Sequence, residues 1–136
     1  TLSGNPVAMA AGLAQLQLLG DPLYDHLQKL GQLLKTDFNA AGFRWKIQNI
    51  ASIFWLYESD DPNSTADQAP RRPDQISRES MQTYAKLHAH CLKHGIYMAP
   101  SGYEVGFLSA PMNEVQIYRL LEVLKDFFQE HEGRAA

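Results

Sequence analysis

Apolar residues recur at intervals of three or four along two long segments of the chain, which is the spacing of an amphipathic helix. The first segment follows Asp21-Pro22, a pair typical of a helix start, and ends near Gly42. Its apolar stripe consists of Leu23, Leu27, Leu30, Leu34 and Phe38. The second segment begins at Asn113, with Gln116 as its capping-box partner. Its stripe consists of Ile117, Leu120, Leu121, Leu124 and Phe128. Each helix therefore has one face for a hydrophobic core.

Two further helices are predicted, and their patterns differ. One spans about Arg78–His94, with Ser77 as a cap and Gly95 as its stop. The other runs from about Pro6 to Leu19 and stops at Gly20. It has a surface of small residues, namely Ala8, Ala10, Ala11, Gly12 and Ala14. A surface of that kind allows another element to approach closely.

Four shorter segments have the composition of strands. Residues 44–50 alternate between apolar and polar side chains, and residues 52–58 are rich in aromatic and β-branched ones. Two more strands are predicted at 97–100 and 104–109, on either side of a Pro-Ser-Gly turn. The order of elements predicts an α+β fold, in which a small antiparallel sheet is covered by helices on one face. Residues 59–77 have little to bury, and we expect a mobile surface loop there.

The composition is that of a single globular domain. The 136 residues are 45% hydrophobic and 20% charged, with a net charge of −3. An acidic balance argues against general nucleic-acid binding, so Trp45, Phe54, Trp55 and Tyr57 are interpreted as core residues rather than a stacking platform. The single cysteine, Cys91, excludes an internal disulfide and suits a reducing cytoplasm.

The uncharged opening of the chain is predicted to be neither a signal peptide nor a membrane span. No charged residue occurs from Thr1 to Gly20, so the basic region of a signal peptide is missing. Polar residues and a proline interrupt the run, at Asn5, Pro6, Gln15 and Gln17. We therefore expect a cytoplasmic protein without a membrane partner.

Two groups of residues suggest chemistry. Asn5 caps the first helix and Pro6 occupies its first turn, so the preceding loop has the free amides and hydroxyls of an anion or phosphate site. The alternative is a buried helix with an ordinary cap. His88, His90, Cys91 and His94 form a second group, on one helix. Their pairs do not converge on one point without ligands from elsewhere, so we predict no metal site and interpret Cys91 as a small core residue.

Three collinear segments carry a resemblance to a known family. They are the run TLSGNPVAMAAGL at Thr1–Leu13, the tripeptide Ser52-Ile53-Phe54, and the run GIYMAPSGYEVGFLS at Gly95–Ser109. Together they resemble the C-terminal part of class III (subgroup II) pyridoxal 5′-phosphate (PLP) aminotransferases, in the form found in glutamate-1-semialdehyde 2,1-aminomutases. The resemblance covers nearly the whole chain.

The resemblance implies that residues 1–136 are the C-terminal small domain of a fold type I PLP enzyme, with 1–20 as a linking loop and helix. It implies a homodimer in which Thr1 binds the cofactor phosphate of the neighbouring subunit, and it places Glu104 near the substrate pocket. Ser3 is a possible helper in phosphate binding or an ordinary turn residue. The implied reaction moves an amino group within glutamate-1-semialdehyde to make 5-aminolevulinate for tetrapyrrole synthesis.

In that family the Schiff-base lysine and the acidic partner of the pyridine nitrogen lie upstream of the Thr-containing loop. We therefore assign no catalytic residue to this chain, and expect it to be inactive and to hold no cofactor without the N-terminal portion of the enzyme. The chain's own lysines are interpreted as structural or solvent-exposed: Lys29, Lys35, Lys46, Lys86, Lys93 and Lys125.

Two departures from the family pattern leave alternatives open. Pro111-Met112 stands where the aminomutases usually have an Ala-His pair, and the loop around 63–73 is longer than the family usually carries. A class III ω-aminotransferase acting on another amine is one alternative. A non-catalytic interaction domain on the same scaffold is the other.

Overall fold

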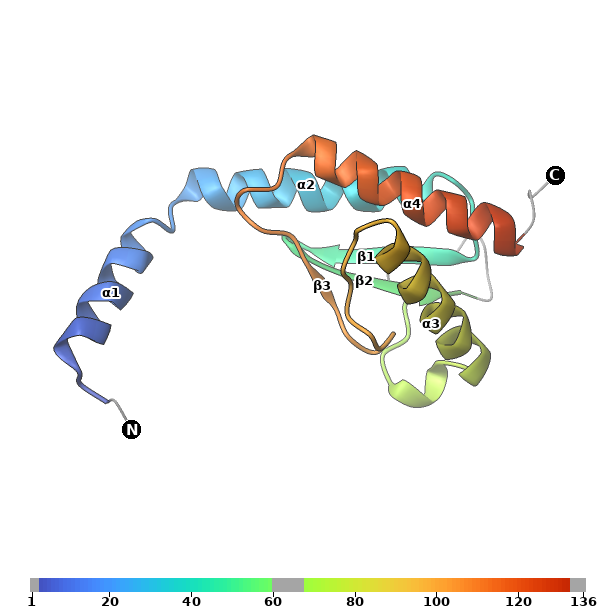
Figure 1. Ribbon diagram of the computed structural model, residues 1–136, viewed down its shortest axis with the longest axis horizontal. Coiled ribbons are helices and arrows are strands. Elements are labelled where there is room, and N and C mark those ends of the chain that lie inside the picture. Colours follow the sequence, from blue (N-terminus) through green and yellow to red (C-terminus); the bar gives the residue numbers. More distant parts are fainter. Residues whose placement is uncertain (1–2, 60–67, 133–136) are drawn as a thin grey trace.

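The computed structural model describes residues 3–59 and 68–132, and it confirms the α+β fold (Figure 1). The elements in chain order are α1 (Pro6–Gln17), α2 (Asp21–Asn39), β1 (Trp45–Ile50), β2 (Ile53–Glu58), the 3-10 helix η2 (Pro73–Gln75), α3 (Arg78–Lys93), β3 (Gly106–Phe107) and α4 (Glu114–Glu132). The three strands form an antiparallel sheet in the order β1-β2-β3. Among the described residues no helix is long and apolar enough to cross a membrane.

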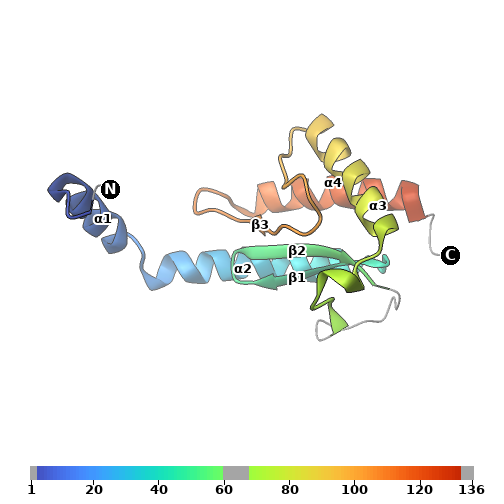
Figure 2. The ribbon, with the colours of Figure 1, turned by 90° about the horizontal axis from the view of Figure 1, so that it is seen from below.

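One face of the sheet forms the floor of the hydrophobic core. The register places Ile47 opposite Leu56, so the alternate residues Trp45, Ile47, Phe54 and Leu56 share this face, and all four are buried. Helices α2 and α4 run side by side over it (Figures 1 and 2). The Trp45 ring stacks on Phe128 of α4, with ring centroids 5.3 Å apart. The expected arrangement, with helices on one face, is observed.

The two amphipathic stripes are buried as their spacing predicts. All five stripe residues of α4 lie in the core, and so do the last three of α2, namely Leu30, Leu34 and Phe38. The first two α2 stripe residues, Leu23 and Leu27, are half-buried. The start of α4 is capped as predicted, since Val115 N donates to Asn113 Oδ1 and Asn113 N donates to Gln116 Oε1.

Helix α2 approaches the β1–β2 turn so closely that only glycine fits at the contact. A Cβ atom on Gly31 would lie 2.0 Å from the carbonyl oxygen of Ala51, a distance that no carbon can occupy. Ala51 itself has a positive φ of 50°, which is uncommon for a residue other than glycine. The turn and the helix are therefore fitted to each other at the backbone level.

The predicted strand at 97–100 is wrong. This segment is irregular, and β3 covers only Gly106–Phe107 of the predicted 104–109. The Ala99 carbonyl of this segment accepts from a side chain rather than from a neighbouring strand, and so does the Gly102 carbonyl in the turn that follows. The Tyr84 hydroxyl donates to the Ala99 carbonyl at 3.0 Å, and the Trp55 indole donates to the Gly102 carbonyl at 2.8 Å. Pro100 has no N–H to donate to a ladder.

Helix α1 is capped as predicted but is not buried within this chain. The Asn5 side chain accepts from the backbone N–H groups of Val7 and Ala8, at 2.9 and 3.2 Å. All residues of α1 are described, and each is exposed; Val7 retains 76% of its accessible surface. Figure 1 shows α1 projecting away from the other elements. Within the described residues α1 is therefore not buried, because no other described element packs against it. Burial of α1 in a larger protein stays a prediction.

The predicted mobile loop at 59–77 lies partly outside the described residues. Its described part is Ser59 and residues 68–77. The latter contain η2, whose turn is closed by the Gln75 side chain accepting from the Arg71 and Arg72 backbone N–H groups. This part therefore has more local structure than a featureless loop.

Candidate functional site

Glu104 lies in a tight turn immediately before β3, and its side chain is exposed. Within this turn, Glu104 N donates to the Ser101 carbonyl at 3.0 Å and Tyr103 N donates to Ser101 Oγ at 3.3 Å. Residues 99–104 thus form a compact turn that presents the carboxylate to solvent. Thr1, the other predicted site residue, lies outside the described residues. Glu104 and Thr1 therefore both remain predictions.

The turn that carries Glu104 is fixed to the body of the protein by α3 and β2. In addition to the bonds from Tyr84 and Trp55, Gly102 packs tightly against α3: a Cβ there would lie 2.8 Å from Met81 Cε and 3.0 Å from Tyr84 Cγ. Burial raises the pKa of Tyr84 to about 12, with smaller contributions from Cys91 and Glu104. At neutral pH the Tyr84 hydroxyl is therefore a neutral donor that holds the turn.

A pocket of about 270 Å³ lies between the end of α3, the sheet and the start of α4. Its lining residues are Phe54, Gly95, Ile96, Tyr97, Met98, Phe107, Leu108, Met112, Gln116, Ile117, Arg119 and Leu120. The one charged group in this lining, Arg119, is paired with Glu122 at 2.6 Å. Neither a lysine nor a carboxylate is among the lining residues, so the pocket suits a small apolar group rather than a Schiff-base cofactor.

The lysines are placed largely as predicted, with one exception. Five lie on α2, α3 and α4. The alternation of residues 44–50 places Lys46 on the polar face of its strand, but it is only 5% exposed, opposite Tyr57 on β2. Its face of the sheet is the one turned away from the core, and strand alternation does not show whether that second face is covered. Strand alternation alone therefore does not predict the burial of Lys46.

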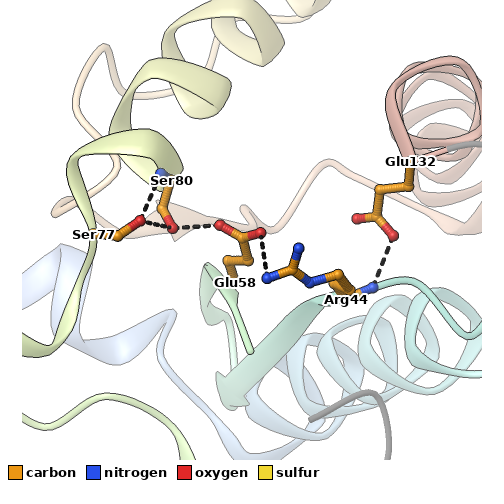
Figure 3. Close-up of polar contacts among 5 residues, drawn as sticks. All are labelled: Arg44, Glu58, Ser77, Ser80 and Glu132. Carbon is orange, nitrogen blue, oxygen red and sulfur yellow. Dashed lines mark hydrogen bonds and ion pairs between the residues drawn. The ribbon is translucent and has the colours of Figure 1, made fainter. Parts of the chain in front are cut away.

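A polar network ties together the ends of four elements (Figure 3). Glu58, at the end of β2, pairs with the Arg44 guanidinium at 3.2 Å and accepts from the Ser80 hydroxyl of α3. Ser77 caps α3 as predicted, since Ser80 N donates to Ser77 Oγ at 3.0 Å. The Arg44 backbone N–H donates to the Glu132 carboxylate of α4 at 2.9 Å. The network joins the sheet to the start of α3 and the end of α4, which is a structural role.

The group of histidines and Cys91 on α3 separates into two parts. Cys91 is fully buried, its Sγ lies 3.7 Å from Met98 Sδ, and burial raises the pKa of its thiol to about 11. It is the core residue that the sequence predicted. His90 and His94 lie together near the surface, where Asp126 of α4 approaches them. The prediction of no metal site rested on the lack of a ligand from elsewhere, and α4 supplies one.

The fold is found in transaminase structures. No family model matches the chain. It is similar over 98% of its length to an omega-transaminase from Sphaerobacter thermophilus, with 23% identity and a TM-score of 0.77. It is also similar to a transaminase with PLP bound, over 96% of its length with 25% identity and a TM-score of 0.67. A beta-phenylalanine aminotransferase from Variovorax paradoxus matches 79% of the chain, with 20% identity and a TM-score of 0.57.

These similarities show which fold the chain has and how much of a transaminase chain it covers. The chain spans 30%, 29% and 24% of the three transaminase chains, respectively. It therefore has the architecture of one segment of an aminotransferase.

Proposed function

We propose that this chain is the C-terminal domain of a PLP-dependent class III enzyme, and that the enzyme is a glutamate-1-semialdehyde 2,1-aminomutase. The observation that carries the class is the match to a transaminase fold over 98% of this chain but only 30% of the larger one. The aminomutase reaction rests on the resemblance of Thr1–Leu13 and Gly95–Ser109 to that branch of the family.

The pocket between α3, the sheet and α4 does not by itself fit the cofactor. This 270 Å³ pocket has an apolar lining with no lysine, and the buried Lys46 lies on the sheet face turned away from the core. When bound, PLP would supply the electron sink for moving an amino group. We assign its binding to the N-terminal portion of the parent enzyme, with Thr1 contributing a hydroxyl to the phosphate across the dimer.

Helix α1 supports a role within a larger assembly. It is apolar on all sides and fully exposed in this chain, whereas a helix of that composition is ordinarily buried. We propose that the N-terminal portion and the dimer mate cover it. Glu104, held on its anchored turn, would then face the pocket formed between this domain and the rest of the enzyme.

The decisive experiment supplies glutamate-1-semialdehyde to the full-length protein that contains this chain. Formation of 5-aminolevulinate without an external amino donor supports the aminomutase. Efficient use of an external donor without that activity supports a class III ω-aminotransferase, the alternative that the omega-transaminase match favours. Absence of cofactor absorbance in the full-length protein would overturn both the aminomutase and the ω-aminotransferase proposals. The non-catalytic interaction domain would then be the remaining alternative.

The assigned residue roles have their own tests in the full-length dimer. Thr1→Val should weaken PLP retention during dialysis, and Thr1→Ser, which keeps the hydroxyl, should restore it. Glu104→Gln should change the KM for the amino substrate while leaving PLP retention unchanged. If Thr1→Val retains PLP as well as the unmodified protein does, Thr1 does not hold the phosphate.

A further inference from the structure

His90 of α3, the α3 C-cap residue His94 and Asp126 of α4 lie together where the two helices meet. One ring nitrogen each from His90 and His94, and one carboxylate oxygen of Asp126, all lie within 4.8 Å of one another. His90 Nε2 lies 3.6 Å from Asp126 Oδ2. The three groups come from two helices that pack against each other, so the fold itself brings them together.

The donor set and its spacing are those of a transition-metal site. His90 and the C-cap residue His94 are four positions apart, and two histidines at that spacing on a helix chelate zinc in known motifs. Ligands about 2.0–2.1 Å from a tetrahedral zinc are separated by roughly 3.4 Å. The 3.6 Å between His90 and Asp126 is close to that value, and rotation of the exposed His94 and Asp126 side chains can close the remaining gap.

A buried nitrogen without a partner points to a missing ligand. Among the described atoms, His90 Nε2 is inaccessible to solvent and has no hydrogen-bond partner, since Asp126 Oδ2 lies just beyond hydrogen-bond distance. The His90 ring is held between neighbours: its centroid lies 4.3 Å from that of His94 and 5.5 Å from that of Phe127. Leaving such a nitrogen unpaired is unfavourable, and coordination of a cation would satisfy it.

A second contact prepares His94 as a ligand. Its Nδ1 lies 2.9 Å from the backbone carbonyl oxygen of His90. A carbonyl only accepts, so Nδ1 carries the proton and Nε2 is the nitrogen that keeps a lone pair. A backbone carbonyl is one of the usual outer partners of metal-binding histidines, because it fixes the tautomer and the direction of the ring.

We propose that His90, His94 and Asp126 bind a zinc-like divalent cation that links α3 to α4, with water completing the coordination. Imidazole nitrogens together with a carboxylate oxygen are a donor set that suits Zn²⁺ and its neighbours Co²⁺ and Ni²⁺. The site does not depend on the proposed function, because its three ligands belong to this chain and lie outside the pocket and the Glu104 turn. A cation held by both helices stabilises the packing of α3 on α4.

The test titrates Zn²⁺ into the chelator-treated 136-residue chain by isothermal calorimetry, and Co²⁺ by visible absorption. We expect saturation at one equivalent and a Co²⁺ spectrum of low coordination number. Zn²⁺ at a hundredfold excess over its Kd should raise the melting temperature by about 5–10 °C. His94→Ala and Asp126→Asn should each weaken binding by at least about tenfold, because each removes one ligand.

The control is His131→Ala, which removes an α4 histidine that stacks on Phe127 but does not belong to the cluster. It should bind Zn²⁺ as the unmodified chain does. His94 and Asp126 are exposed, so their variants should fold, and circular dichroism checks this. Absence of one-to-one binding, or equal loss in the His131→Ala control, would overturn the site. Unchanged affinity in Asp126→Asn would do the same and leave only adsorption to surface histidines.

Discussion

Helices α1 and α4 are both rich in apolar residues, yet every residue of α1 is exposed while seven residues of α4 are buried. The difference lies in the arrangement of the residues rather than in their amount. The apolar residues of α4 form one stripe that meets α2 and the sheet. Those of α1 are spread around the whole helix, so no single face is marked for the core.

The comparison shows what each helix depends on. The one-sided pattern of α4 is satisfied by elements of the same chain. Burying the all-round pattern of α1 takes more than one neighbour, and within the described residues no element packs against it. The fold of residues 21–132 should therefore be insensitive to α1, while the state of α1 should depend on the rest of the proposed enzyme.

The largest test of this contrast substitutes one leucine in each region. Leu34→Ala removes a side chain that is 0% exposed and should lower the free energy of unfolding by about 2–5 kcal/mol, because it leaves a cavity. Leu16→Ala makes the same change at a residue that is 66% exposed, and should alter the free energy of unfolding by less than about 0.5 kcal/mol. Urea unfolding followed by tryptophan fluorescence measures both. Equal losses would mean that α1 packs on the core.

Substituting one glycine in α2 and one in α1 tests how closely each helix backbone approaches its neighbours. Gly31→Ala should cost about 1–3 kcal/mol, since the new Cβ would collide with the Ala51 carbonyl oxygen and force α2 away from the turn. Gly12→Ala meets nothing within 4 Å and should instead favour helix α1 by up to about 1 kcal/mol. Urea unfolding measures the first effect and far-ultraviolet circular dichroism the second. A stable Gly31→Ala variant would contradict the close approach.

The helix caps give a smaller effect. Ser77→Ala removes the oxygen that accepts from Ser80 N and should lower the global free energy of unfolding by about 1 kcal/mol. Asn5→Ala removes an equivalent bond at α1. It should reduce helix content by circular dichroism without shifting the urea midpoint. A shifted midpoint in Asn5→Ala would show that α1 unfolds together with the core.

Local signals predicted much of the fold. Stripe spacing identified α2 and α4, and the caps at Asn5, Ser77 and Asn113 lie where the sequence placed them. These features depend on residues within one or two helical turns, so a single sequence contains the necessary information. The succession of elements predicted the small antiparallel sheet, although one of its four predicted strands does not form.

Features that depend on distant residues were not predicted. The segment 97–100 has strand composition, but Tyr84 takes up the carbonyl of Ala99. Lys46 is buried by a covering that strand alternation does not show. The approach of Asp126 to His90 requires the crossing of α3 and α4, which no spacing within either helix specifies. Of the candidate site, only the position of Glu104 on its turn is described, and its role remains a prediction.

The smallest effect concerns the pH dependence contributed by the buried thiol of Cys91, which has no counterpart in α1 because α1 contains no ionisable side chain. Burial raises the pKa of Cys91 from 9.0 to about 11, so the folded state holds the thiol proton more tightly than the unfolded state does. This contribution is fully present below pH 9 and is lost as the pH rises from 9 to 11. At pH 9.5 the loss should be less than about 1 kcal/mol. Urea unfolding at pH 7 and 9.5 measures the free energy of unfolding. Its decrease between these pH values should be smaller in Cys91→Ala, which has no thiol to titrate. An unchanged decrease in that variant would mean that the thiol titrates alike in both states.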